Sequence, residues 1–127
     1  MIEEAETDAL RRFLRDNEGD RVVSSALVRT ELRRAVLRFI ERTTITDEEA
    51  QELALRGAAV LRGLDLVRVS ATVLDLAGAQ RPAGLRSLDA IHLATALRLG
   101  SQLDAVVAYD HRLTDATRSA GLVTLAP

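Results

Sequence analysis

Apolar positions along the chain follow two spacings, which predict helices that alternate with short strands. Helical spacing of three and four residues is expected over residues 3–16, 26–42, 46–62, 71–79, 87–99 and 112–120. Short apolar runs predict strands at residues 21–24, 66–69, 105–109 and 122–125. Strands that alternate with helices are typical of an α/β fold, a parallel sheet sandwiched between helices.

Capping residues mark where these helices begin and end. Thr46 and Glu49 form a Thr-x-x-Glu capping box, and Ser25, Ser70 and Ser87 are expected N-caps. Four glycines are expected to follow helix ends: Gly19, Gly63, Gly100 and Gly121. The two helices on either side of residues 43–45 are therefore expected to form an antiparallel hairpin.

Two helices carry a clear apolar face. In the helix over residues 26–42 the expected buried residues are Val28, Leu32, Val36, Phe39 and Ile40. In the first helix, Glu3 to Asp16, one face carries the apolar residues Ala5, Ala9, Leu10, Phe13 and Leu14. The strand over residues 105–109 is apolar throughout, which predicts burial on both of its faces.

Three acidic residues are expected to meet at one edge of the sheet. Asp89 lies in the first turn of the helix over residues 87–99, and Asp110 follows the next strand directly. Glu31 lies in the first two turns of the helix that follows the strand 21–24. Because a crossover helix starts at the carboxyl edge of a parallel sheet, all three belong to that edge, where ligands bind.

Composition limits the chemistry. The chain has 127 residues, which predicts one domain, 1–127, and it has no cysteine, which excludes disulfides and Cys-ligated metals. All 17 basic residues are arginine, so there is no lysine for a P-loop, a Schiff base or a receiver-type phosphoacceptor site. No apolar run nears the ~20 residues that span a bilayer, and no signal peptide is evident, so we expect a cytoplasmic protein without membrane contact.

Carboxylates crowded at one edge repel each other unless a cation or shared protons compensate. Oxygen ligands without cysteine, in a chain with two histidines, favour Mg²⁺ or Mn²⁺ over zinc. Such an ion can activate water and offset charge on a phosphoryl group, which is the chemistry of metal-dependent nucleases.

Three segments resemble a known family. The block Leu88-Asp89-Ala90-Ile91-His92, the later Tyr109-Asp110 and the earlier Arg29-Thr30-Glu31-Leu32 are similar to the PIN-domain ribonucleases, specifically the VapC-type toxins of toxin-antitoxin pairs. The resemblance implies a PIN-like fold and a Mg²⁺-dependent endoribonuclease that acts on RNA such as tRNA or rRNA. It also implies a homodimer and inhibition by a cognate antitoxin. Glu31, Asp89 and Asp110 match three acidic site positions of the family.

One segment of the family pattern has no counterpart. Family members usually begin with an apolar strand that carries a Leu-Asp-Thr/Ser motif, whose Asp binds metal, whereas here the first helix starts at Glu3. The expected fold is thus PIN-like with the N-terminal strand absent, and a chain without it is expected to be weakly active or rearranged. The alternative function is a catalytically impaired or truncated PIN-like module that retains only antitoxin binding, through its first helix and the helical hairpin.

Each candidate residue also has a structural interpretation. Asp89 fits a partner of the helix dipole, Glu31 an ion pair with Arg34, and Asp110 an N-cap. We expect His92 to be structural. Four arginines near the proposed edge could contact phosphates or simply be solvated, and Arg112 is the preferred substrate-binding candidate among Arg29, Arg33, Arg34 and Arg112.

Overall fold

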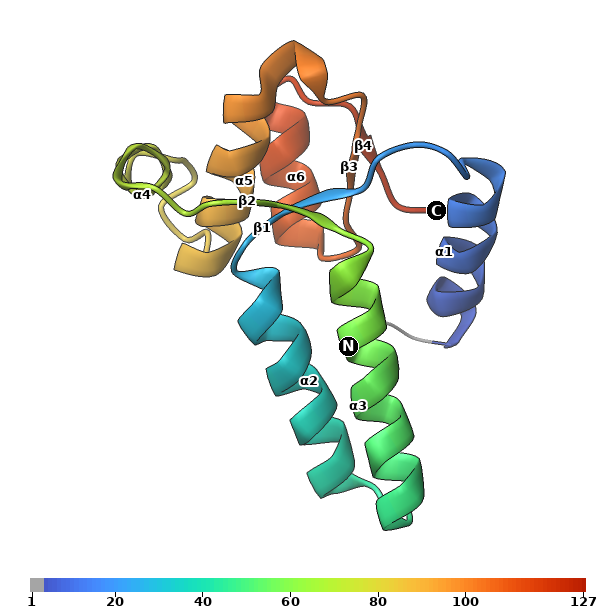
Figure 1. Cartoon of the computed structure of the whole chain (residues 1–127). Helices are drawn as coiled ribbons and strands as arrows, with labels where there is room; N and C mark the ends of the chain where they lie inside the picture. Colours follow the sequence, from blue (N-terminus) through green and yellow to red (C-terminus); the bar gives the residue numbers. More distant parts are fainter. Residues whose placement is uncertain (1–3) are drawn as a thin grey trace. The chain divides into compact units, whose positions relative to one another are not determined.

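The computed structural model describes the backbone of residues 4–127 and the side chains from Asp8 onwards (Figure 1). The chain divides into two compact units, which are described separately. Unit 1 comprises residues 1–20 and 70–127, and unit 2 comprises residues 21–69. The expected α/β fold is confirmed, but its parallel sheet is small and split into two pairs of strands. The single domain 1–127 stays a prediction.

Unit 2 consists of one parallel strand pair joined by a helical hairpin. Strand β1 (Val23–Ser25) pairs with β2 (Asp65–Val67), with Ser24 opposite Leu66. The connection runs through α2 (Val28–Arg42) and α3 (Asp47–Arg62), which pack against each other as the expected hairpin. A parallel pair needs such a long crossover because its strands must start at the same end.

Local signals explain the ends of α3. The Thr46 hydroxyl accepts a hydrogen bond from the Glu49 amide at 3.1 Å, and the Glu49 carboxylate accepts one from the Thr46 amide at 3.4 Å. The capping box is therefore confirmed, and Gly63 ends the helix as expected. The other end of the hairpin differs from expectation, because α2 begins at Val28 with Leu27 as its N-cap. The Ser25 hydroxyl instead accepts a hydrogen bond from the Leu27 amide, in the turn that precedes α2. The prediction that Ser25 is the N-cap of this helix was therefore wrong.

Unit 1 contains four helices and the second strand pair among its described residues. The helices are α1 (Glu4–Asp16), α4 (Ala71–Gly78), α5 (Ser87–Leu99) and α6 (His111–Ser119), with the short 3₁₀ helix η1 (Gly100–Gln102) after α5. Strand β3 (Val106–Val107) pairs in parallel with β4 (Thr124–Leu125). Helix α1 begins at Glu4, the first residue whose backbone is described, so the expected absence of an N-terminal strand falls outside the described residues. No helix in that range is both long and apolar enough to cross a lipid bilayer.

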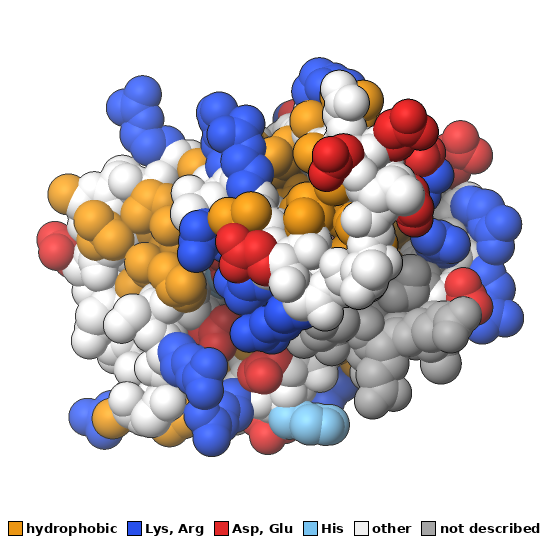
Figure 2. Space-filling view, turned by 90° about the horizontal axis from the view of Figure 1, so that it is seen from below, with side chains coloured by type: hydrophobic (Ala, Val, Ile, Leu, Met, Phe, Trp, Pro, Cys, Tyr) orange, Lys and Arg blue, Asp and Glu red, His pale blue; other side chains and the backbone are white. Residues whose placement is uncertain are grey.

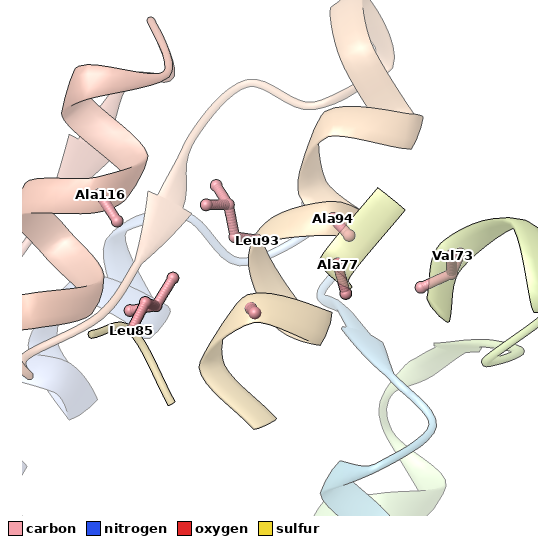
Figure 3. Close-up of a cluster of buried hydrophobic side chains, with 7 residues drawn as sticks. Val73, Ala77, Leu85, Leu93, Ala94 and Ala116 are labelled. Atoms are coloured by element: carbon pink, nitrogen blue, oxygen red, sulfur yellow. The ribbon is translucent and has the colours of Figure 1, made fainter. Parts of the chain in front are cut away.

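The core of unit 1 lies around α5, between α4 and α6. Figure 3 shows Ala94 of α5 facing Ala77 of α4, and Leu93 pointing toward the side where Ala116 of α6 lies. Leu93 is 1% exposed and Ala94 is fully buried. Because alanine side chains are small, α4 and α6 can approach α5 closely, and α5 is packed against a helix on each of two sides. This places the first turn of α5, and with it Asp89, in a defined position within unit 1.

Three further expectations were wrong. Ser87 is the first residue of α5 and not its N-cap, which is Arg86. Phe39 is 40% exposed, because it lies at the margin of the α2 face whose centre packs on α3. The strand at residues 105–109 is reduced to Val106–Val107 and is not buried on both faces, since Val107 is 40% exposed and pairs with β4 on one side only. Ala5, which was expected on the apolar face of the first helix, lies outside the described side chains.

Candidate active site

Asp110 lies where β3 ends and α6 begins, as the sequence predicts. Its side chain is the N-cap of α6, and one carboxylate oxygen accepts a hydrogen bond from the Leu113 amide at 3.0 Å. The residue is exposed. The cap satisfies one amide of the first turn and the negative charge suits the positive end of the helix dipole. The cap orients the carboxylate while one oxygen remains outside this hydrogen bond.

Asp89 lies in the first turn of α5 and is half-buried. Helix α5 leads through η1 into β3, which leads into α6, so β3 runs opposite to both helices. Figure 1 accordingly shows α5 and α6 starting at the same end of unit 1, and the two helices contact each other. Asp89 and Asp110 thus belong to one end of one compact unit, as the crossover argument predicts.

Glu31 belongs to the other unit. It lies in the first turn of α2, three residues after the start of that helix and just beyond the carboxyl end of β1, and it is half-buried. This is its expected place at the end of a parallel strand pair. Within the described residues no three Asp, Glu or His side chains lie together in a group that could hold a metal ion. The meeting of Glu31 with Asp89 and Asp110 therefore stays a prediction.

All basic residues of the chain are arginines, and they occur in both units. Arg112 is exposed on the first turn of α6, two residues after Asp110. In unit 2, Arg21 donates a hydrogen bond to Asp65 at 2.8 Å beside the start of the β1–β2 pair, and this bond raises the pKa of Arg21. Figure 2 shows arginine side chains in several groups on the face seen from below, with apolar side chains between them.

His92 lies one helical turn after Asp89 on α5 and is half-buried. It has an interaction within the protein, and its structural role stays a prediction. Asp89, Glu31 and Tyr109 likewise have interactions within the protein.

Comparison with known proteins assigns the family. The family model described as "PIN domain" matches residues 2–118. The chain belongs to the PIN-domain family.

The PIN-domain assignment is supported by curated relatives of similar length. Ribonuclease VapC46 of Mycobacterium tuberculosis strain H37Rv is 44% identical over 126 residues, which cover 99% of this chain and 88% of the relative. Ribonuclease VapC47 of Mycobacterium tuberculosis strain CDC 1551 / Oshkosh is 40% identical over 129 residues, covering 100% of this chain and 88% of the relative. Ribonuclease VapC35 is 38% identical over 126 residues. No solved structure matches the chain significantly. The resemblance to VapC-type PIN proteins is confirmed.

Proposed function

We propose that this PIN-domain chain is a divalent-metal-dependent endoribonuclease that acts as the toxin of a type II toxin-antitoxin pair. The observation that carries the proposal is the common end of unit 1 where α5 and α6 start, with Asp89 and Asp110 in the first turn and at the cap. Two carboxylates from adjoining helix starts are a reasonable basis for a phosphodiester-hydrolysing site. The relatives named ribonuclease support the same activity.

Glu31, Asp89 and Asp110 are the residues we propose to hold Mg²⁺ or Mn²⁺. Their donor atoms are all carboxylate oxygens, which fits a hard cation. When bound, such an ion supplies a Lewis acid for the phosphoryl oxygens and lowers the pKa of water. Asp110 would contribute the carboxylate oxygen outside its cap, and exposed Arg112 would bind a substrate phosphate from the first turn of α6.

The proposed substrate is RNA of the tRNA or rRNA class, and the proposed partners are a cognate antitoxin and a second copy of this chain. We place the reaction in the cytoplasm, where both RNA classes are available. The exposed apolar side chains of the α2–α3 hairpin support protein partners, since Leu37 is 41% and Leu55 is 63% exposed.

A second candidate function is a PIN-like module that binds its antitoxin but does not cleave RNA. It is favoured by one observation, the exposed apolar side chains of Leu37 and Leu55 on the α2–α3 hairpin, which suit a protein partner. The two candidates differ in metal affinity, because a binding module has no need of a cation. Weak Mn²⁺ binding together with tight antitoxin binding is therefore the result expected of the second candidate.

The test is cleavage of a mixed tRNA pool by the full chain in Mg²⁺ or Mn²⁺, beside Asp89→Asn and a reaction without metal. We expect the parent to cut and both controls to be inactive. Asp115→Asn is the matched control, because Asp115 is an exposed carboxylate on α6 outside the proposed site. A folded parent that leaves the pool intact at every metal concentration overturns the proposal. Mn²⁺ titration by calorimetry gives a readout that does not depend on cleavage.

A further inference from the structure

Helix α2 carries a concentration of positive charge that the proposed metal site does not use. Its 15 residues include five arginines and two glutamates, whereas the whole chain has a net charge of −2. Like charges four residues apart on a helix destabilise it by a few tenths of a kcal/mol per pair. Because the net charge of the whole chain is negative, the clustering of arginines on α2 is not a consequence of a generally basic composition. The cost points to a specific role for α2.

The arginines of α2 divide between two faces. At 100° per residue, Arg34, Arg38 and Arg42 follow one another at i, i+4 spacing and lie within about 60° of Glu31 around the helix. Arg33 lies on the opposite side, where it borders the apolar cavity of about 320 Å³ between α2 and α3. The face with Arg34, Arg38 and Arg42, here called the α2 basic face, therefore begins at Glu31 and points away from α3.

The side chains of the α2 basic face are available for binding. Arg34, Arg38 and Arg42 are all exposed. The ion pairs Arg21–Asp65 and Arg56–Glu52, in the described part of the chain, involve none of them. Arginines that are held by carboxylates would first have to give up those partners, whereas these three can meet an anion directly.

The spacing of the α2 basic face suits a strand of phosphates. Successive members are about 6 Å apart along the axis, since each residue of a helix rises about 1.5 Å. The face extends about 16 Å from Glu31 to Arg42 at the same rise per residue. A repeat of this size is close to the separation of neighbouring phosphates in an extended RNA strand. An acidic protein segment could also pair with arginines, but a row that starts at a proposed catalytic carboxylate favours the substrate.

We propose that Arg34, Arg38 and Arg42 bind the phosphate backbone of the RNA beside the cleavage point and position it over Glu31. This inference rests on the proposed ribonuclease function and adds an RNA-binding role for the α2 basic face. The three arginines are positioning residues. They raise substrate affinity without taking part in hydrolysis, and they bind any sequence because phosphates carry no base information.

The experiment measures binding separately from cleavage. The full chain is titrated against fluorescently labelled bulk tRNA in EDTA at several salt concentrations, so that no metal-dependent cleavage occurs. The test variant is R34Q/R38Q/R42Q. The matched control is R11Q/R12Q/R15Q, which removes the same charge from three exposed arginines of another helix, α1. Glutamine keeps the helix propensity close to that of arginine. A lysine variant, R34K/R38K/R42K, keeps the charge and tests for rescue.

We expect the α2 triple variant to bind at least tenfold more weakly than the parent. Its slope of log affinity against log salt should be smaller by about 2, since each phosphate contact to a single strand contributes about 0.7. The α1 control should stay within twofold of the parent, and the lysine variant should recover most of the affinity. In Mg²⁺ or Mn²⁺ the α2 triple variant should raise KM and leave kcat unchanged.

Two results overturn the inference. Equal losses in the α1 and α2 variants would mean that net charge alone matters, and unchanged affinity in the α2 variant would mean that the RNA lies elsewhere. In the second case, weaker binding of the antitoxin by the same variant would assign the face to that partner. The proposed function can fail independently of this inference. A chain that binds tRNA through the α2 basic face without cutting it would support the inference and contradict the proposed ribonuclease activity.

Discussion

The carboxylate of Asp110 accepts a hydrogen bond from the backbone amide of Leu113 at 3.0 Å, so a proposed metal ligand is also the N-cap of α6. The two roles can be separated by substitution. Asp110→Asn keeps a side-chain oxygen for the cap but removes the charge that a cation needs. We expect the free energy of unfolding of this variant to lie within about 0.5 kcal/mol of that of the parent. We also expect the variant to lose RNA cleavage.

Asp110→Ala removes both roles and should lower the free energy of unfolding by about 1 kcal/mol, which is the typical contribution of an N-cap. Urea titration followed by circular dichroism measures both variants. Full cleavage activity in Asp110→Asn contradicts the ligand role, whereas equal stability of the Asn and Ala variants contradicts the cap.

Leu93 anchors the helix that carries Asp89. It is 1% exposed and belongs to the core cluster of unit 1. Leu93→Ala should lower the free energy of unfolding by about 2–5 kcal/mol, because buried area is lost and a cavity remains. Leu88→Ala is the control on the same helix, since Leu88 is 48% exposed, and it should change stability by less than about 1 kcal/mol. Similar midpoints for the two variants in urea would contradict the placement of the core.

Much of the local structure could be predicted because it depends on neighbouring residues. The capping box of Thr46 and Glu49, the cap at Asp110 and the end of α5 at Gly100 are all determined within three or four positions. Ser87 failed as a cap although its residue type is right, because α5 begins one residue earlier than that role allows. Serine is compatible with both positions, so residue type alone does not distinguish them.

Burial and the site depend on longer-range packing. The spacing of Phe39 predicts a buried residue, yet α2 is covered by α3 on one side only and Phe39 lies at the margin. The same limit applies to the acids. Asp89 and Asp110 belong to one unit joined by a short chain segment, so topology predicts their common end, whereas Glu31 belongs to the other unit. The arginines Arg38 and Arg42 were missed, although their four-residue spacing from Arg34 was visible in the sequence.

A pair of threonines ties α6 to β4 at the end of unit 1. The Thr117 hydroxyl is fully buried, donates to the Thr114 carbonyl at 2.9 Å and lies 2.8 Å from the Thr124 hydroxyl. Thr117→Val should lower the free energy of unfolding by about 1–2 kcal/mol. In a double-mutant cycle with Thr124→Val we expect a coupling of about 0.5–1 kcal/mol. Additive effects in chemical denaturation would mean that the hydroxyls do not interact.

Gly57 offers a stabilising substitution in unit 2. It lies inside α3, where glycine is less favourable than alanine by roughly 0.5–1 kcal/mol because it loses more backbone freedom on folding. A Cβ at this position would lie 3.5 Å from the Val36 side chain, an ordinary contact that adds to the packing of α2 on α3. Gly57→Ala should therefore raise the melting temperature by a few degrees.

Gly100 is the contrasting glycine for this experiment, because a Cβ there would meet nothing within 4 Å but the residue has a φ of +54°. With a ψ of −127°, Gly100 has a conformation that L side chains rarely adopt, and an alanine there is strained by about 1–3 kcal/mol. Gly100→Ala should consequently lower the melting temperature while Gly57→Ala raises it, as measured by differential scanning calorimetry. A lower melting temperature for Gly57→Ala would show that the hairpin is too closely packed at Val36 to accept one more methyl group.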